Sequence, residues 1–331
     1  MQLAIRARRH YKRLMHIVVI MDPVSTVKAE GDTTFALMEE AALRGHRVDH
    51  CLNTDLYLDS GRVFARVAPA TMQRTQPVPI ALGTPEDISL HDVDAVLVRT
   101  DPPFDDNYLW STQLLEIVKR DTVVANDPRG LRDANEKLYA CQFPQLMPET
   151  IVTSHKARIK AFITRVGGQA VIKPLGGRGG EGVLVLRTGD PNVNAIIEGT
   201  TLEGRRPAMV QVFMPEVRVG DKRILVLDGE PLGAILRVPS SEEVRSNLRV
   251  GGTAVKAELD AADLRIVQTL APRLRADGLW FVGLDVIGGK LTEVNVTSPT
   301  GIQSMQKLDQ KPHATTVIQA LERRVAAAKA S

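Results

Sequence analysis

The sequence is poor in aromatic side chains, in cysteine and in long apolar runs. Aromatic residues make up only 4% of its 331 residues, which argues against a stacking platform for nucleic acid. Its two cysteines, Cys51 and Cys141, form no CxxC pair, so neither a disulfide framework nor a zinc site is indicated and a reducing compartment is expected. No apolar run approaches the ~18–20 residues of a membrane span. We therefore expect a cytoplasmic protein with no membrane or nucleic-acid partner.

Positive charge is concentrated at the amino terminus. The net charge is +3, but residues 1–14 contain five basic side chains and no acidic one, so the rest of the chain is mildly acidic. The basic stretch could be a targeting or binding arm, or a disordered extension. Because Met15 opens a clean apolar strand and residues 1–14 lack a long amphipathic run, we expect the extension.

Short apolar segments alternate with helical ones over residues 15–133, which predicts a parallel α/β layer. The expected strands are 15–21, 46–52, 94–99 and 122–126, and the expected helices are 33–45 and 108–119. Thr33 or Thr34 is the expected cap of the first helix. Beyond residue 133 the pattern changes to α+β, with a short helix at 134–143, strands at 149–153 and 170–174, helices at 155–166, 260–276 and 314–328, and a glycine-containing β-rich stretch at 170–237.

The most informative segment is a glycine-rich loop at residues 176–182, which holds five glycines in seven residues. Such loops let backbone N–H groups turn toward an anion without obstruction by a Cβ atom. The loop has no GxxxxGK[ST] pattern, and its literal GxGxxG match is followed by an apolar strand instead of a helix, which excludes both common phosphate motifs. We predict a strand–loop–strand flap over phosphates, reached also by Lys173. A flexible β-turn is the alternative interpretation.

Three other positions are candidates for nucleotide contacts. Lys137 lies in a predicted helix, where an isolated lysine is usually a solvated surface residue. The strand end at 211–214 could link two lobes and offer backbone groups to an adenine edge, or it could be a plain edge strand. Arg223 follows Asp221 at the start of a strand and can present a planar guanidinium to phosphate or acyl oxygens.

A predicted hairpin at residues 284–296 carries oxygen ligands suited to Mg²⁺. Glu293 and Asn295 are two apart on one strand and face the same side. A two-residue turn at Gly288 and Gly289 would put Asp285 on the other face, whereas a three-residue or bulged turn over 288–290 would bring it to the other two. A three-ligand site therefore predicts the longer turn, and a plain polar hairpin face is the alternative.

The order of these motifs resembles the ATP-grasp fold. The local sequence resembles that of the bacterial glutathione synthetases, most specifically in Asp-Pro-Pro-Phe-Asp at 101–105 and Glu-x-Asn-Val-Thr-Ser-Pro at 293–299. The matching stretches extend from residue 19 to 301. The resemblance implies an ATP-grasp fold, α/β and α+β, with an N-terminal parallel α/β domain. The implied divisions are an extension at 1–14, a substrate domain at 15–133, a central lobe at 134–214, and a C-terminal lobe at 215–331 with a lid at 238–252.

The resemblance also implies roles for individual residues. Lys173 and Arg223 are expected to be catalytic. ATP contacts are expected from Lys137, Lys173, Gly176, Gly177, Gly179, Gly180, Gly182, Gln211, Val212, Phe213, Met214, Asp221 and Arg223. Mg²⁺, with Mn²⁺ as a second candidate, is expected at Asp285, Glu293 and Asn295. Other substrate contacts are expected from Asp22, Arg99, Asp101, Arg237, Asn247, Ser298, Thr300 and Gly301. Residues 1–14 have no counterpart in the family, the lid sequence departs from it at 245–250, and the role of Arg178 is unassigned.

The implied reaction joins γ-glutamylcysteine to glycine. ATP would phosphorylate the peptide carboxylate, and the amine of glycine would displace phosphate from the acyl phosphate without a protein nucleophile. Alternatives are a D-alanine or glutamate-adding ligase with the same ATP half, and a non-catalytic nucleotide-binding protein. The loop at 101–105 favours a glutathione synthetase over the other ligases. Retention of the strand lysine and of the magnesium ligands opposes a non-catalytic nucleotide-binding protein. Family members are commonly homo-oligomers, so a dimer or tetramer is expected by analogy.

Overall fold

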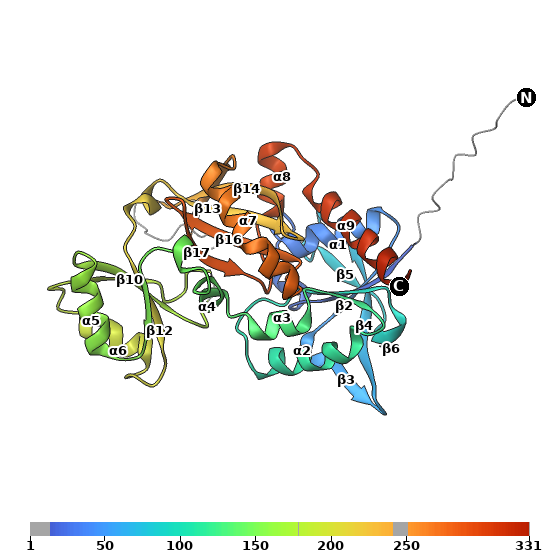
Figure 1. Ribbon diagram of the computed structural model, residues 1–331. Coiled ribbons are helices and arrows are strands. Elements are labelled where there is room, and N and C mark those ends of the chain that lie inside the picture. Colours follow the sequence, from blue (N-terminus) through green and yellow to red (C-terminus); the bar gives the residue numbers. More distant parts are fainter. Residues whose placement is uncertain (1–13, 178, 241–250, 331) are drawn as a thin grey trace, which may run out of the picture.

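A computed structural model describes residues 14–177, 179–240 and 251–330, which form three sheets with helices packed on them (Figure 1). The first sheet has a parallel centre in the order β2-β1-β7-β8. Its strands are β1 (His16–Ile20), β2 (Arg47–Cys51), β7 (Ala95–Val98) and β8 (Val123–Ala125), and its helices are α1 (Thr33–Leu43) and α2 (Asp106–Val118). All four predicted strands and both predicted helices of this layer are present.

The first sheet is nevertheless mixed, not purely parallel. Four further strands join it in antiparallel pairings: β3 (Leu56–Asp59), β4 (Arg62–Met72), β5 (Ile80–Leu82) and β6 (Glu86–Ser89). The prediction of a parallel layer missed them because their exposed outer faces weaken the apolar signal of a buried strand.

The predicted cap of α1 was also wrong. The Asp32 carboxylate accepts a hydrogen bond from Phe35 N at 2.8 Å and caps the helix. Thr33 Oγ1 instead accepts from Gly301 N, and Thr34 Oγ1 accepts from Arg99 Nε, at 3.1 Å each. Both threonines therefore serve contacts with distant parts of the chain.

The second sheet is antiparallel and forms a lobe at the left of Figure 1. Its order is β11-β10-β12-β9, with β9 (Thr150–Thr153), β10 (Gln169–Pro174), β11 (Leu184–Arg187) and β12 (Ala208–Val212). Helices α5 (Lys156–Arg165) and α6 (Val193–Thr201) pack on it around a small apolar core of their own. Helix α6 was not predicted, because it lies within a stretch whose glycines and β-branched residues indicated strands.

The third sheet carries the predicted hairpin. Its antiparallel order is β15-β14-β13-β16-β17, with β13 (Asp221–Leu227), β14 (Glu230–Val238), β15 (Thr253–Lys256), β16 (Phe281–Ile287) and β17 (Lys290–Asn295). Helix α7 (Ala261–Ala276) packs on it, and α3 (Pro128–Asp133) and α4 (Glu136–Ala140) lead into the second sheet. Short 3₁₀ helices occur at Val24–Thr26, Asn53–Asp55, Leu90–Asp92, Pro144–Leu146 and Pro215–Arg218.

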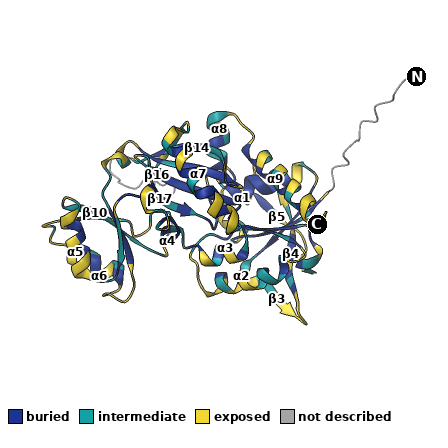
Figure 2. Cartoon of the chain, in the orientation of Figure 1, coloured by how far each residue is buried: buried dark blue, intermediate teal, exposed yellow. Residues whose placement is uncertain are grey.

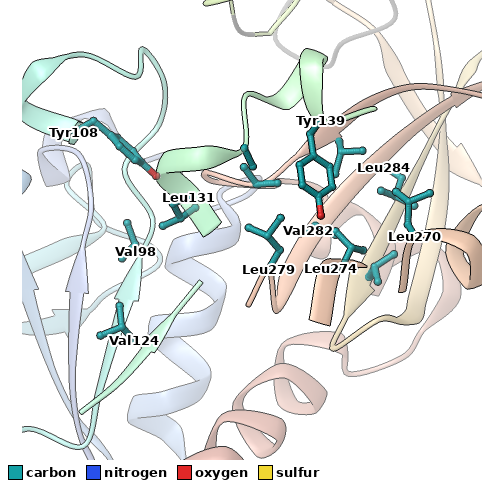
Figure 3. Close-up of a cluster of buried hydrophobic side chains, with 14 of the residues drawn as sticks. Val98, Tyr108, Val124, Leu131, Tyr139, Leu270, Leu274, Leu279, Val282 and Leu284 are labelled. Atoms are coloured by element: carbon teal, nitrogen blue, oxygen red, sulfur yellow. The ribbon is translucent and has the colours of Figure 1, made fainter. Parts of the chain in front are cut away.

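The apolar core extends from the first sheet into the third. Val98, Tyr108 and Leu131 belong to the same buried cluster as Leu270 and Leu284 (Figure 3). Buried strands lie beneath helices whose outer faces are exposed (Figure 2). Because one core serves both layers, the first domain is packed firmly against the third sheet.

The end of the chain returns to the first layer. Helices α8 (Ile302–Asp309) and α9 (His313–Ala328) follow the third sheet, and α9 packs against α1. Arg44 donates two hydrogen bonds to the Glu322 carboxylate, at 3.0 and 2.8 Å, next to the ring of His46. Among the residues described, no helix is both long enough and apolar enough to span a bilayer.

Candidate active site

A cavity of about 930 Å³ lies between the second and third sheets. Its walls combine apolar side chains, including Val171, Val185 and Ile287, with charged ones. It is lined by many of the predicted nucleotide residues, namely Lys137, Lys173, Gly177, Gly179, Gly180, Gln211, Val212, Phe213, Met214 and Asp221. Two of the predicted metal ligands, Asp285 and Glu293, line it as well. A cavity with both apolar and charged walls suits a ligand with a hydrophobic part and an anionic part.

The glycine loop forms the predicted strand–loop–strand unit. Strands β10 and β11 pair antiparallel on either side of it, with Ile172 opposite Leu184. Gly179, Gly180 and Gly182 have φ of 58°, 86° and 67°, which L side chains rarely adopt. The described part of the loop covers the cavity through residues 177 and 179–181.

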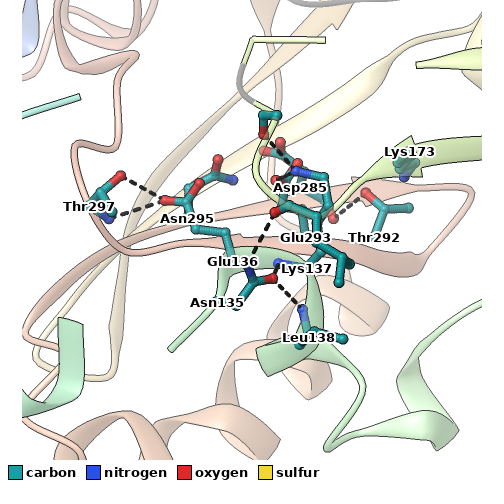
Figure 4. A network of polar contacts seen from close by, with 12 residues as sticks. Asn135, Glu136, Lys137, Leu138, Lys173, Asp285, Thr292, Glu293, Asn295 and Thr297 are labelled. Atoms are coloured by element: carbon teal, nitrogen blue, oxygen red, sulfur yellow. Dashed lines mark hydrogen bonds and ion pairs between the residues drawn. The ribbon is translucent and has the colours of Figure 1, made fainter. Parts of the chain in front are cut away.

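Two lysines bring positive charge to the cavity. Lys137 is buried, and its Nζ donates to Gly177 O at 2.8 Å and to Glu293 Oε1 at 3.0 Å (Figure 4). Lys173 Nζ donates to Gln211 Oε1 at 2.6 Å. Desolvation lowers the pKa of Lys173, Glu293 opposes this, and Lys137 lowers the pKa further. Lys137 is therefore not a solvated surface lysine, and an anion bound between the two would offset the unfavourable charge.

The hairpin of β16 and β17 has the strand register that a three-ligand site needs, but a β-bulge and not a longer turn produces it. The turn is a tight two-residue one, since Ile287 pairs with Lys290, and both turn glycines have positive φ. The prediction of a longer turn was therefore wrong. A β-bulge beyond the turn adds Thr292 to β17 and brings Asp285 opposite Glu293. Turn length alone cannot reveal such a bulge.

The oxygens of the hairpin differ in how they are engaged. The buried Asp285 carboxylate accepts from Arg223 Nε at 2.6 Å and Nη2 at 3.1 Å, and pairs with Arg237 at 3.0 Å. Burial favours a raised pKa for Asp285, but the two guanidinium groups hold that pKa well below its usual range. Glu293 Oε2 and Asn295 Oδ1 have no partner among the described residues.

This donor set fits a magnesium ion. A carboxylate and an amide oxygen are available on one face, with a second carboxylate beside them, and Mg²⁺ takes its remaining ligands from phosphate and water. Within the described ranges no cluster of three His, Cys, Asp or Glu side chains is suited to a metal. A magnesium ion held here would therefore need the Asn295 amide and oxygens from its ligand.

A second cavity, of about 740 Å³, adjoins the first and shares Gly179 and Glu293 with it. Arg223, Arg237 and Asn295 also line this second cavity. Arg223 Nη1 donates to Thr300 O at 3.0 Å, and Arg237 forms an ion pair with Asp221. Gly176 and Gly182 line neither of these cavities.

A third cavity, of about 1720 Å³, lies on the first domain and shares Asp101, Ser298, Thr300 and Gly301 with the second. Asp22 and Arg99 line it as well. Arg99 donates to Pro299 O at 2.9 Å, and burial lowers the pKa of this arginine. Shared lining residues therefore connect the three cavities in a row, from the first through the second to the third. Asn247 and Arg178 lie outside the described residues.

The two halves of the chain match two family models. Residues 15–132 match the N-terminal domain of prokaryotic glutathione synthetase, and residues 136–310 match its ATP-grasp domain. The chain belongs to the prokaryotic glutathione synthetase family. It is 46% identical over 305 residues to glutathione synthetase of Thermosynechococcus vestitus, covering 89% of this chain and 96% of that protein. It is 41% identical over 314 residues to the glutathione synthetase of Vibrio parahaemolyticus, covering 94% of this chain and 99% of that protein.

Solved structures with low sequence identity share the ATP-grasp fold. D-cycloserine synthetase DcsG aligns with a TM-score of 0.66 at 16% identity, over 93% of this chain and 99% of that one. The ATP-grasp ligase PsnB, in complex with minimal precursor, Mg and ADP, aligns with a TM-score of 0.59 at 14% identity, over 94% and 98%. These likenesses confirm the predicted fold of this glutathione synthetase family member. The family models and the curated relatives show that the protein is an ATP-dependent ligase.

Sequence reasoning assigned no role to Glu136, which lines the second cavity. Its Oε1 accepts from Val296 N, Thr297 N and Thr297 Oγ1 at 2.9 to 3.1 Å. Burial raises the pKa of this carboxyl group, and the charge of Glu293 raises it further. The only sequence signal was its position directly before Lys137, which places neighbouring side chains of opposite charge at the start of α4.

Proposed function

We propose that this protein is a glutathione synthetase that joins γ-glutamylcysteine to glycine and converts ATP to ADP and phosphate. The observation that carries the proposal is the row of three cavities. The second cavity shares lining residues both with the first cavity, in the ATP-grasp part of the chain, and with the third cavity, on the first domain. Reaction within such a row keeps an acyl phosphate close to its amine acceptor and away from bulk water.

The first cavity would hold ATP. Residues 211–214 would contact adenine, and Lys137 and Lys173 would bind the phosphates beneath the glycine flap, with Gly176, Gly177, Gly179, Gly180 and Gly182 turning its backbone. Lys173 would also stabilise charge on the transferred phosphoryl group, since a desolvated ammonium gains most from an anion. Asp221 would hold Arg237 in place through their ion pair.

Glu293 and Asn295 would hold Mg²⁺, or Mn²⁺ with the same oxygen ligands, and Asp285 would support or complete the set. An ion held there would supply positive charge beside the phosphates of ATP, which is the chemistry that phosphoryl transfer needs. Arg223, fixed by Asp285 and by Thr300 O, would stabilise the acyl phosphate from the second cavity.

The third cavity would hold γ-glutamylcysteine, with Asp22, Arg99 and Asp101 facing it. Ser298, Thr300 and Gly301 line both this cavity and the second one, where Arg237 would help to bind substrate carboxylates. Asn247 would contribute from the lid at 238–252. The proposal extends to a cytoplasmic homo-oligomer, a dimer or tetramer, which rests on analogy with the family.

The test is phosphate release from ATP and Mg²⁺ with γ-glutamylcysteine and glycine. We expect one phosphate per glutathione, with release that requires both substrates. Glu293→Ala should abolish magnesium-dependent turnover, whereas the exposed control Glu198→Gln should not change it. Turnover that requires D-alanine or glutamate in place of glycine would assign the chain to a different ligase of the fold. If the protein binds ATP but shows no turnover with glycine, D-alanine or glutamate, it is a non-catalytic nucleotide-binding protein.

A further inference from the structure

The second cavity is the place where an amine acceptor must meet the acyl group, because it joins the phosphate end of the first cavity to the substrate end of the third. At neutral pH the amine of an amino acid is an ammonium ion, which has no lone pair for attack. The site therefore needs a group that binds the ammonium and removes a proton from it. This requirement depends on the proposed ligase function.

Glu136 is held rigidly at the wall of this cavity by one of its two oxygens. Oε1 accepts from Val296 N at 2.9 Å, Thr297 N at 3.1 Å and Thr297 Oγ1 at 2.9 Å (Figure 4). The backbone that carries Glu136 is fixed as well, because Asn135 Oδ1 accepts a hydrogen bond from Lys137 N at 3.1 Å. Three donors on Oε1 leave Oε2 without a partner among the described residues, in a residue that lines the cavity.

The other charged groups of this cavity already have partners. Glu293 pairs with Lys137, and the guanidinium groups of Arg223 and Arg237 pair with Asp285. Asp101 lies where the second cavity meets the third. Glu293 Oε2 also lacks a partner among the described residues, but it belongs to the proposed magnesium site. Glu136 Oε2 is therefore the uncommitted carboxylate oxygen left for an amine, and Glu136 lies between Lys137 and the loop at 297–301.

We propose that Glu136 Oε2 binds the ammonium group of the acceptor amino acid and takes a proton from it. The N–H bond breaks, the proton forms a carboxylic acid with Oε2, and the freed nitrogen lone pair attacks the acyl carbon. As the C–N bond forms and the C–O bond to phosphate breaks, phosphate leaves with that electron pair and takes a second proton from nitrogen. Glu136 returns its proton to water when the product departs.

The experiment compares two acceptors on the purified full-length protein with ATP, Mg²⁺ and γ-glutamylcysteine. Glycine carries an ammonium ion at neutral pH, whereas hydroxylamine is largely uncharged there and needs neither ion pairing nor a base. The variant is Glu136→Gln, whose amide oxygen can still accept from Val296 and Thr297. The matched control is Asp133→Asn, an exposed carboxylate of the same segment that lines a different cavity.

For Glu136→Gln we expect turnover with glycine to fall by ~10²- to 10⁴-fold, the usual range for loss of a general base. Hydroxamate formation from hydroxylamine should stay within about threefold of wild type, and Asp133→Asn should be unaffected with both acceptors. Equal losses with glycine and hydroxylamine would show that Glu136 only shapes the loop, and unchanged turnover with glycine would also overturn the proposal. If the wild type forms no hydroxamate while binding ATP, the proposed acyl-phosphate ligase itself fails.

A second variant covers the case in which Glu136→Gln does not fold. Glu136→Asp keeps the charge but withdraws the free oxygen from the cavity by one methylene. We expect a loss with glycine of about tenfold or more and no comparable loss with hydroxylamine. A parallel loss with both acceptors would contradict the proposal.

Discussion

At the scale of the residue, the charges of the candidate site are balanced unevenly. The Asp285 carboxylate has two arginine partners, whereas Lys173 is desolvated and, among the residues that the structure describes, is bound by the neutral Gln211 amide alone. The Lys173 ammonium therefore lies in the proposed phosphate site without a carboxylate partner among the described residues, and its desolvation is a cost to folding that a bound polyanion offsets.

This imbalance predicts opposite effects of Lys173→Met on stability and on binding. ATP affinity should fall by roughly 10- to 100-fold, because a hydrogen bond to a charged group contributes about 1.5–3 kcal/mol. The ATP-free variant should unfold at no lower temperature than the wild type, since the desolvated ammonium is gone. Calorimetric titration with ATP and thermal unfolding measure the two effects. The exposed Lys160→Met is the control, and a clear loss of stability in Lys173→Met alone would contradict the argument.

Asp285→Asn, unlike Lys173→Met, should destabilise the folded protein, because Asp285 pairs with two arginines. At neutral pH the variant should lose about 3–5 kcal/mol of stability, because Arg223 keeps its buried charge without a counterion and Arg237 keeps only Asp221 as a partner. The folded-state pKa of Asp285 is depressed, so its contribution is present above the ordinary aspartate pKa of ~4 and is lost as pH falls below it. Denaturant unfolding in EDTA from pH 7 to pH 3 should therefore be less pH-dependent in the variant than in wild type. A steeper dependence in the variant would refute this.

At the scale of the element, the flap depends on backbone conformations that only some of its glycines require. Gly182 has φ of +67°, and a Cβ there would lie 2.9 Å from Pro174 Cγ. Gly176 has an ordinary φ and open space around it. The glycines of the loop are therefore not equivalent, although the sequence presents them as one run.

We expect Gly182→Ala to raise the KM for ATP by about tenfold, because the flap must move to relieve both the strained φ and the clash. Gly176→Ala should have a distinctly smaller effect. Steady-state kinetics with varied ATP measure both, and Gly199→Ala, in helix α6 with nothing within 4 Å of the added Cβ, controls for general effects. Similar values for Gly176→Ala and Gly182→Ala would mean that conformation does not govern the flap.

The elements also show where sequence reasoning succeeded and where it failed. Strand–loop–strand at the flap followed from the apolar run after the glycines, and the facing of Glu293 with Asn295 followed from strand periodicity. The bulge at Thr292 could not be predicted, because a regular ladder and a bulged one contain the same residue types. Strands β3 to β6 were missed for a related reason: strands with one solvated face lack a continuous apolar run.

At the scale of the whole molecule, the decisive contacts join residues that are far apart in the sequence. Arg44 meets Glu322, Arg99 meets Pro299 O, and Glu136 meets Thr297. Local periodicity has no information about such pairings, so the joining of three cavities into one row could not be read from the sequence. The resemblance supplied candidate residues, and the packing of the first sheet on the third brought them together.

One buried side chain connects these two layers most directly. Asn126, at the end of β8, donates through Nδ2 to Phe281 O at 2.9 Å and Val296 O at 2.8 Å, and accepts from Phe281 N at 2.7 Å. Phe281 begins β16, and Val296 follows directly after Asn295. The amide therefore ties the first domain to both strands of the hairpin with the proposed magnesium site.

Asn126→Ala should cost about 2–4 kcal/mol, because it leaves three buried backbone groups without a partner. It should also lower kcat more than it raises the KM for ATP, since the nucleotide cavity is built by the second and third sheets, whereas the reaction needs the hairpin aligned with the first domain. Thermal unfolding and steady-state kinetics test the two parts, with the exposed Asn192→Ala, whose side chain caps nothing, as the control. A loss of stability with kcat unchanged would show that the layers can shift without disturbing the site, and the tie would then be structural only.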